Sequence, residues 1–90
     1  MSLNAENLKS MSVRQLALEA SNDPAYQKSR KALYAAEPYL QAMCQLDSIN
    51  DRYFCDSGKS VVLYFLCNAR AWKGDVARLV KAELNRRVKS

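Results

Sequence analysis

An uninterrupted apolar run, VVLYFLC at residues 61–67, leaves few choices for the fold of this chain. Taken alone, the run fits a buried strand as well as a buried helix, because it is rich in β-branched and aromatic residues. The residues that follow it, up to Gly74, are compatible with a helix, and the sequence offers no identifiable partner strand. We therefore predict one helix over residues 58–73, which forms the centre of the core and is apolar on nearly every side.

The scarcity of turn-forming residues extends this prediction to the whole chain. Only two glycines and two prolines occur among 90 residues, while good helix formers are plentiful. A chain of this length with 49% hydrophobic residues can build one core. We predict an all-α, compact single-domain bundle of four to five helices over residues 12–90, with helices at about 12–21, 24–36, 38–50, 58–73 and 76–88. For residues 1–11 two structures fit the sequence: a frayed N-terminal segment, or an extension of the first helix.

Capping patterns set several of these boundaries. Ser12 and Gln15 have the spacing of a capping box, and Asp23 followed by Pro24 is typical of a helix start. Pro38 predicts a break before the third helix, and Gly74 suits the end of the fourth. The polar stretch before the apolar run is expected to be a loop that Tyr53 and Phe54 pin to the core.

The tripeptide GKS at residues 58–60 invites comparison with a phosphate-binding loop. Such a loop needs a further glycine five residues before the conserved one, and that position is Tyr53 here. The tripeptide is better explained as the first turn of a helix with Asp56 or Ser57 as its cap. The chain also lacks histidine, the commonest general base near neutral pH, so we expect no enzyme activity and no cofactor.

The three cysteines, Cys44, Cys55 and Cys67, form no C-x-x-C unit. We expect buried or half-buried free thiols and no metal site. No secretory signal is evident at the N-terminus, and seven apolar residues fall far short of the roughly 20 that a membrane-spanning helix needs. A cytoplasmic location is therefore expected.

The net charge of +5 is concentrated at one end of the sequence. Basic and acidic residues cancel over residues 1–69, seven against seven, whereas residues 70–90 carry seven basic residues against Asp75 and Glu83. Glu83 and Arg87 are four residues apart and are expected to form an ion pair on the last helix. The candidate face for nucleic acid or an acidic partner comprises Arg70, Lys73, Arg78, Lys81, Arg86 and Lys89.

Two functions fit these observations, with no small-molecule substrate evident. The first is a small non-catalytic module that binds another protein, or a second copy of itself, and has a regulatory role. Its candidate anchors are the aromatic residues Trp72, Tyr34, Tyr39 and Tyr53. For each of them, packing in the core is the competing explanation. The second is nucleic-acid binding through the basic C-terminal helix and the turn before it, an arrangement that loosely resembles a helix-turn-helix. Binding of the last helix to anionic lipid is a weaker alternative, because its apolar face is needed to close the core.

Overall fold

The predicted all-α class is confirmed by the computed structural model, which describes residues 4–54 and 56–89. This part of the chain forms six α-helices, one 3-10 helix and a two-stranded hairpin. The elements are α1 (Ala5–Lys9), α2 (Val13–Asn22), α3 (Pro24–Lys28), η1 (Tyr34–Ala36), α4 (Glu37–Met43), β1 (Arg52–Tyr53), β2 (Asp56–Ser57), α5 (Gly58–Asn68) and α6 (Asp75–Lys89).

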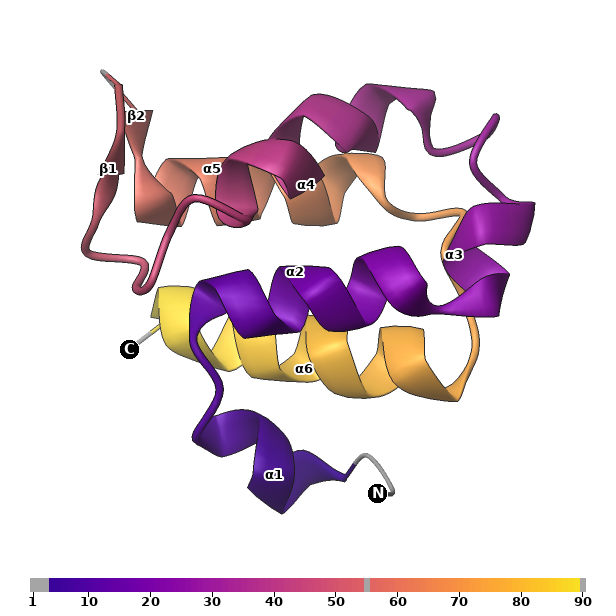
Figure 1. The fold of residues 1–90 in the computed structure, drawn as a ribbon, viewed down its shortest axis with the longest axis horizontal. Coiled ribbons are helices and arrows are strands. Elements are labelled where there is room, and N and C mark those ends of the chain that lie inside the picture. The colour runs from indigo at the N-terminus through magenta and orange to yellow at the C-terminus, as the bar shows by residue number, and fades with distance from the viewer. Residues whose placement is uncertain (1–3, 55, 90) are drawn as a thin grey trace.

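Four helices enclose the core in two pairs. Figure 1 shows α2 beside α6 in one layer and α4 beside α5 in the other, with α3 closing one end and the hairpin at the opposite end. Contacts of α2 with α4 and of α5 with α6 join the two layers. The largest buried side chains, among them Trp72, Tyr26 and Phe65, fill the space between them.

The predicted caps are present where the sequence places them. The Ser12 hydroxyl accepts a hydrogen bond from Gln15 N, and the Gln15 side chain accepts one from Ser12 N, which completes the capping box of α2. Asp23 caps α3 by accepting from the backbone N–H of Ala25. These side chains satisfy N–H groups that the helix itself leaves unpaired, so they fix where α2 and α3 begin.

The predicted helix over residues 24–36 is wrong in its second half. The α-helical part ends at Lys28, and the chain continues through a turn into the 3-10 helix η1. Leu33 N donates to the Ser29 carbonyl and also, in the tighter i to i+3 pattern, to the Arg30 carbonyl. This winding buries Leu33 and leaves Ala32 exposed, although a regular helix would have placed Ala32 on the apolar side.

The predicted helix over 38–50 is also too long, because α4 ends at Met43. Backbone carbonyls in the segment after α4 accept hydrogen bonds from the first turn of α2. Val13 N donates to the Asp47 carbonyl, and Arg14 N donates to the Leu46 carbonyl. The Arg14 guanidinium also donates to the Cys44 carbonyl at 3.1 Å. A contact between distant parts of the chain therefore ends α4, and no local signal in the sequence marks it.

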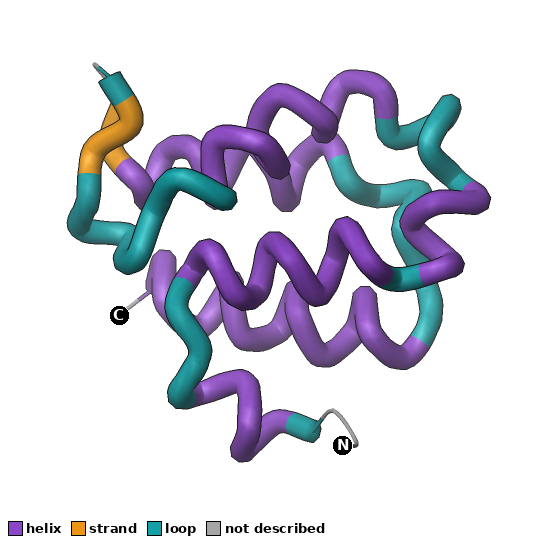
Figure 2. The backbone as a smooth tube through the Cα atoms, in the orientation of Figure 1, coloured by secondary structure: helices purple, strands orange, loops and turns teal. Residues whose placement is uncertain are grey.

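The fourth predicted helix is confirmed as helical but ends at Asn68 rather than at residue 73. The Asn68 side chain donates to the Tyr64 carbonyl at 2.8 Å and so satisfies an acceptor in the last turn. The loop that follows, visible in Figure 2 between α5 and α6, carries Trp72 back into the core. The last predicted helix, 76–88, agrees with α6 to within one residue at each end.

The segment predicted as a loop contains the short β1–β2 hairpin, in which Arg52 pairs with Ser57 and Tyr53 with Asp56. Tyr53 is half-buried and packs against the core, as expected. Phe54 does not pin the loop: it is 85% exposed and has a positive φ of 56° at the tip of the hairpin. Cys55 lies outside the described residues.

Residues 4–11, whose state the sequence left open, contain a separate helix. Asn4 caps α1 by accepting from Asn7 N, and Leu8 is fully buried against the core. Figure 1 shows α1 beside the layer of α2 and α6, and it contacts α6. The first and last described helices are therefore packed together.

Candidate protein-interaction surface

Helix α5 has one apolar side in the core and a second apolar side at the surface. Val61, Val62 and Phe65 are buried, whereas Leu63 and Tyr64 are 42% and 53% exposed. Cys67, which lies four residues after Leu63, is exposed as well. The helix is apolar on nearly every side, as expected, but it does not lie at the centre of the core, because the two layers of helices cover only one side of α5.

We call the exposed side, formed by Leu63, Tyr64 and Cys67 together with Tyr39 of α4, the α5 face. The rings of Tyr39 and Tyr64 stack with centroids 5.4 Å apart and planes inclined by 27°. This stacking connects α4 to α5 at the surface and orders the Tyr64 ring. The result is an apolar stripe whose members are spaced as one side of a helix.

The position of α5 is set by close packing at its first residue. A side-chain carbon on Gly58 would lie 2.8 Å from the Ile49 carbonyl oxygen and 2.9 Å from that of Ser48. The Gly58 N–H donates to the Asp51 carbonyl at 2.6 Å, and the Ser57 hydroxyl caps the helix by accepting from Ser60 N. The glycine of the GKS tripeptide is thus explained by close contact with the preceding turn, and the interpretation as a capped first helical turn is confirmed.

Of the four aromatic residues predicted as anchors, three reach the surface to some extent. Tyr34 is 82% exposed on η1, which packs against α5. Tyr39 is half-buried in the α5 face, and Tyr53 is half-buried at the hairpin, where its ring meets that of Phe54 edge-on. The structure therefore brings Tyr39 and Tyr34 near α5 and places Tyr53 at its N-terminal end.

Trp72 is not available as an anchor, because it is fully buried. Its indole N–H donates to Asp23 at 2.8 Å, and its ring meets those of Tyr26 and Phe65 edge-on. The Asp23 carboxylate thus has two roles: it caps α3, and it holds the indole of Trp72 in place. Asp23 and Trp72 are 49 residues apart in the sequence. The competing explanation of core packing is the correct one for Trp72.

The six candidate basic residues divide between solvent and internal contacts. Arg70, Lys73 and Lys89 are exposed, and Arg78 is exposed beside Asp75 at 3.5 Å. Lys73, Arg78 and Lys81 line a hollow of about 430 Å³ at the start of α6. Lys81 is half-buried there and donates to the Trp72 carbonyl at 2.6 Å. Burial, assisted by the charge of Lys73, lowers the pKa of the Lys81 ammonium.

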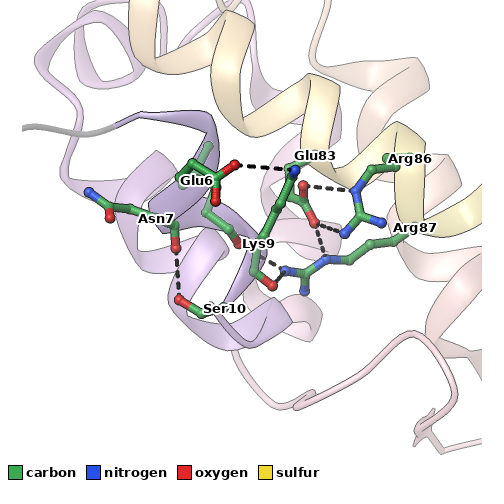
Figure 3. A network of polar contacts seen from close by, with 8 residues as sticks. Glu6, Asn7, Lys9, Ser10, Glu83, Arg86 and Arg87 are labelled. Carbon is green, nitrogen blue, oxygen red and sulfur yellow. Dashed lines mark hydrogen bonds and ion pairs between the residues drawn. The ribbon is translucent and has the colours of Figure 1, made fainter.

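Arg86 is engaged in a network that sequence reasoning found only in part. Glu83, buried to 6% exposure, accepts from the guanidinium groups of both Arg86 and Arg87. Arg87 also donates to the Leu8 carbonyl at 2.9 Å, and so connects α6 to the end of α1 (Figure 3). The hydrogen bond from Arg86, followed by that from Arg87, holds the pKa of Glu83 below its usual value despite burial. The predicted pair of Glu83 and Arg87 is confirmed.

A second, more polar hollow of about 280 Å³ lies between the end of α2 and α4. Glu37 lines it and accepts a hydrogen bond from the Tyr26 hydroxyl at 3.3 Å. Burial and the neighbouring Glu37 raise the pKa of this hydroxyl, so that it stays protonated as a donor. Burial also raises the pKa of the half-buried Cys44 thiol, which lies in the same wall. The Tyr26 hydroxyl and the Cys44 thiol are therefore both protonated at neutral pH.

The expectation for the cysteines holds in part. Cys44 and Cys67 are free thiols, but Cys67 is exposed rather than half-buried, and Cys55 lies outside the described residues. Over residues 4–54 and 56–89, no group of three potential metal ligands converges. In the same part of the chain, no helix combines the length and the apolar character needed to cross a bilayer.

The α5 face is the feature that sequence reasoning missed. Its signal was the spacing of Val61, Val62 and Phe65, which share one side of a helix and leave Leu63 and Cys67 on the other. Comparisons with protein-family models, with curated proteins and with solved structures found no match to this chain.

Proposed function

We propose that the chain is a small, non-catalytic protein-interaction module that docks on a partner protein through the α5 face. The observation that carries the proposal is the exposure of Leu63 and Tyr64 at 42% and 53% on a helix whose other side forms the core. Exposed apolar side chains are common singly, but neighbouring exposed apolar side chains that form one patch are typical of interaction sites.

The residue types of the α5 face support this function. Tyrosine offers a large contact area with little conformational entropy to lose, and the stacked Tyr39 and Tyr64 have already lost part of theirs. Leu63, next to them, supplies an aliphatic surface that a partner can desolvate. The regulatory role and the cytoplasmic location expected from the sequence stay predictions.

Substitution of Leu63 tests the proposal. Leu63→Glu places a charge in the centre of the α5 face without touching the core, so the variant is expected to fold as the wild type does. Proteins that co-purify with the tagged wild type from cells that make it should be reduced at least about tenfold, the equivalent of about 1.4 kcal/mol. Quantitative mass spectrometry of the co-purified proteins measures this change.

Leu18→Glu is the matched control, because Leu18 is 46% exposed but lies on α2. It adds the same charge to an equally exposed leucine on another helix, and should leave the co-purified proteins unchanged. Equal effects of the two substitutions, or no effect of Leu63→Glu, would contradict the proposal. Circular dichroism and a urea titration of both variants confirm that each is folded.

Nucleic-acid binding is a second candidate, which the hollow at the start of α6 favours. Lys73 of the loop before α6 lines this hollow together with Arg78 and Lys81 of α6, and the exposed Arg70 precedes Lys73 in that loop. Three features weaken it: Asp75 also lines the hollow, Lys81 is bound to the Trp72 carbonyl and Arg86 is paired with Glu83. The alternative therefore rests on fewer accessible cations than the sequence suggested.

A salt titration of duplex DNA binding tests this second candidate. If the hollow contacts phosphates, Lys73→Glu with Arg78→Glu should abolish binding at low salt, and the wild-type affinity should fall steeply as salt is added. Fluorescence anisotropy of a labelled duplex measures both. Lys9→Glu with Lys28→Glu, at two exposed lysines on other helices, is the control for a loss of net charge alone.

A further inference from the structure

The charges around the α5 face identify the kind of partner that would occupy it. We propose that the α5 face binds an amphipathic helix of another protein that carries one acidic residue at each end of its apolar stripe. This inference rests on the proposed function, because it names the partner class for the same surface. It deepens that proposal by assigning roles to Lys59 and Arg70.

Both ends of the α5 face are positively charged. Lys59 is exposed in the first turn of α5, and Arg70 is exposed two residues after its end. Neither makes an ion pair with any residue in 4–54 or 56–89. The chain has no acidic residue between Asp56 and Asp75.

The spacing of these cations fits three turns of a partner helix. Lys59 and Asn68, the last residue of α5, are nine residues apart, about 13–14 Å along the helix axis at about 1.5 Å per residue, and Arg70 lies two residues beyond that end. On a partner helix packed lengthwise against α5, acidic residues at positions i and i+11 would reach the two cations. Positions i+4 and i+7 lie on the same side of that helix, because 3.6 residues make one turn, and would meet Leu63 and Tyr64.

A second copy of this chain fits the surface less well. If two α5 faces met with their helices antiparallel, Lys59 of each copy would lie near Arg70 of the other; if they met in parallel, Lys59 would face Lys59. Both arrangements oppose like charges at each end, on a chain that already carries a net charge of +5. An acidic helix removes this repulsion and adds attraction.

Two synthetic helical peptides test the inference directly. Both have 16 residues, leucine at i+4 and i+7, and a hydrocarbon staple on the far side, since short helices are marginal in water. One carries glutamate at i and i+11, and the other carries lysine there. At low salt the glutamate peptide should bind wild-type protein about 5- to 30-fold more tightly, because each of two exposed pairs changes from repulsion to attraction.

Two variants show whether the charges and the surface are those proposed. Lys59→Glu with Arg70→Glu should reverse the preference in favour of the lysine peptide, while Leu63→Glu should weaken both peptides. Amide chemical-shift changes should map to residues of α4 and α5. Equal affinity for the two peptides, failure of both to bind, or shift changes on other helices would overturn the inference.

Other occupants of the face give different results, each of which overturns the inference. A wild-type dimer in sedimentation that Leu63→Glu converts to a monomer would indicate a second copy of the chain. Sedimentation with phosphatidylserine vesicles that requires Leu63 would indicate a lipid surface. The variant Lys59→Glu with Arg70→Glu also separates this inference from the proposed function. If this variant still co-purifies with the proteins that Leu63→Glu loses, the α5 face is a docking surface, but its partner is not the acidic helix.

Discussion

Glu83 is the single buried acidic side chain in the described part of the chain, and three hydrogen bonds from two arginines compensate its burial. An unpaired carboxylate at this depth would be strongly disfavoured, so Arg86 and Arg87 are structural residues as much as surface charges. The pair of Glu83 with Arg87 could be predicted from the four-residue spacing in the sequence, whereas the pair with Arg86 was not predicted. The link through Arg87 to the Leu8 carbonyl could not, because 79 residues separate the two.

Removing the charge of Glu83 is expected to destabilise the fold. Glu83→Gln keeps the shape but weakens the hydrogen bonds from both arginines, and should lower the free energy of unfolding at pH 7 by about 1.5–3 kcal/mol. Urea unfolding followed by tryptophan fluorescence measures the change. Glu6→Gln is the control: Glu6 has an 84% exposed side chain that pairs with Lys9, and its change should stay within about 0.5 kcal/mol.

The same carboxylate predicts a pH dependence with a definite sign. The pKa of Glu83 is lower in the folded chain than the unfolded value of about 4.3, so the unfolded state binds the proton more tightly. The stability that Glu83 contributes is complete above that unfolded value and is lost as the pH falls through the lowered folded value. The difference between wild type and Glu83→Gln should therefore shrink below about pH 4 and stay constant from pH 6 to 8; a constant difference at all pH values would contradict this assignment.

At the scale of elements, Gly58 shows how a helix boundary depends on distant backbone. Glycine costs a helix about 1 kcal/mol relative to alanine, so Gly58→Ala should stabilise α5 if propensity alone decided. The Ile49 and Ser48 carbonyls leave no room for the added carbon. We expect Gly58→Ala to destabilise the protein by about 1–3 kcal/mol, as overpacking does.

Urea unfolding measures this effect, with Lys59→Ala as the neighbouring control. Lys59 is exposed in the same turn, so its substitution should change the free energy of unfolding by no more than about 0.5 kcal/mol. A stabilising Gly58→Ala would show that the turn at residues 48–51 yields easily. It would also remove the packing explanation for glycine in the GKS tripeptide.

The elements also show what the sequence could and could not predict. Helix starts were predicted well, because Ser12, Asp23 and Ser57 act on N–H groups two or three residues away. Helix ends were predicted poorly where a distant segment sets them, as at Met43, where the carbonyls that follow are bonded to α2. The exposed side of α5 was missed for a similar reason: an apolar residue in a run does not reveal whether a neighbouring helix covers it.

For the whole molecule, the packing of α1 on α6 is the contact that brings the two ends of the described chain together. Leu8 is fully buried, and the Arg87 guanidinium bonds to the carbonyls of Leu8 and Lys9 (Figure 3). A cation at this position also faces the negative end of the α1 dipole. We therefore expect α1 to unfold together with the rest of the core rather than to fray independently.

Leu8→Ala tests this coupling through the stability of the entire domain. Removing a fully buried leucine side chain should lower the free energy of unfolding by about 2–4 kcal/mol, because a cavity is left between α1 and α6. Leu18→Ala, at a leucine that is 46% exposed, should cost less than half as much. The urea transition measured by tryptophan fluorescence reports on Trp72, which lies in the core and far from α1 in sequence, so a shift of that transition shows that the effect is global. If Leu8→Ala leaves the Trp72 transition unchanged and alters only amide exchange within residues 4–10, α1 is an appended helix, and the cooperative unit ends at Ser12.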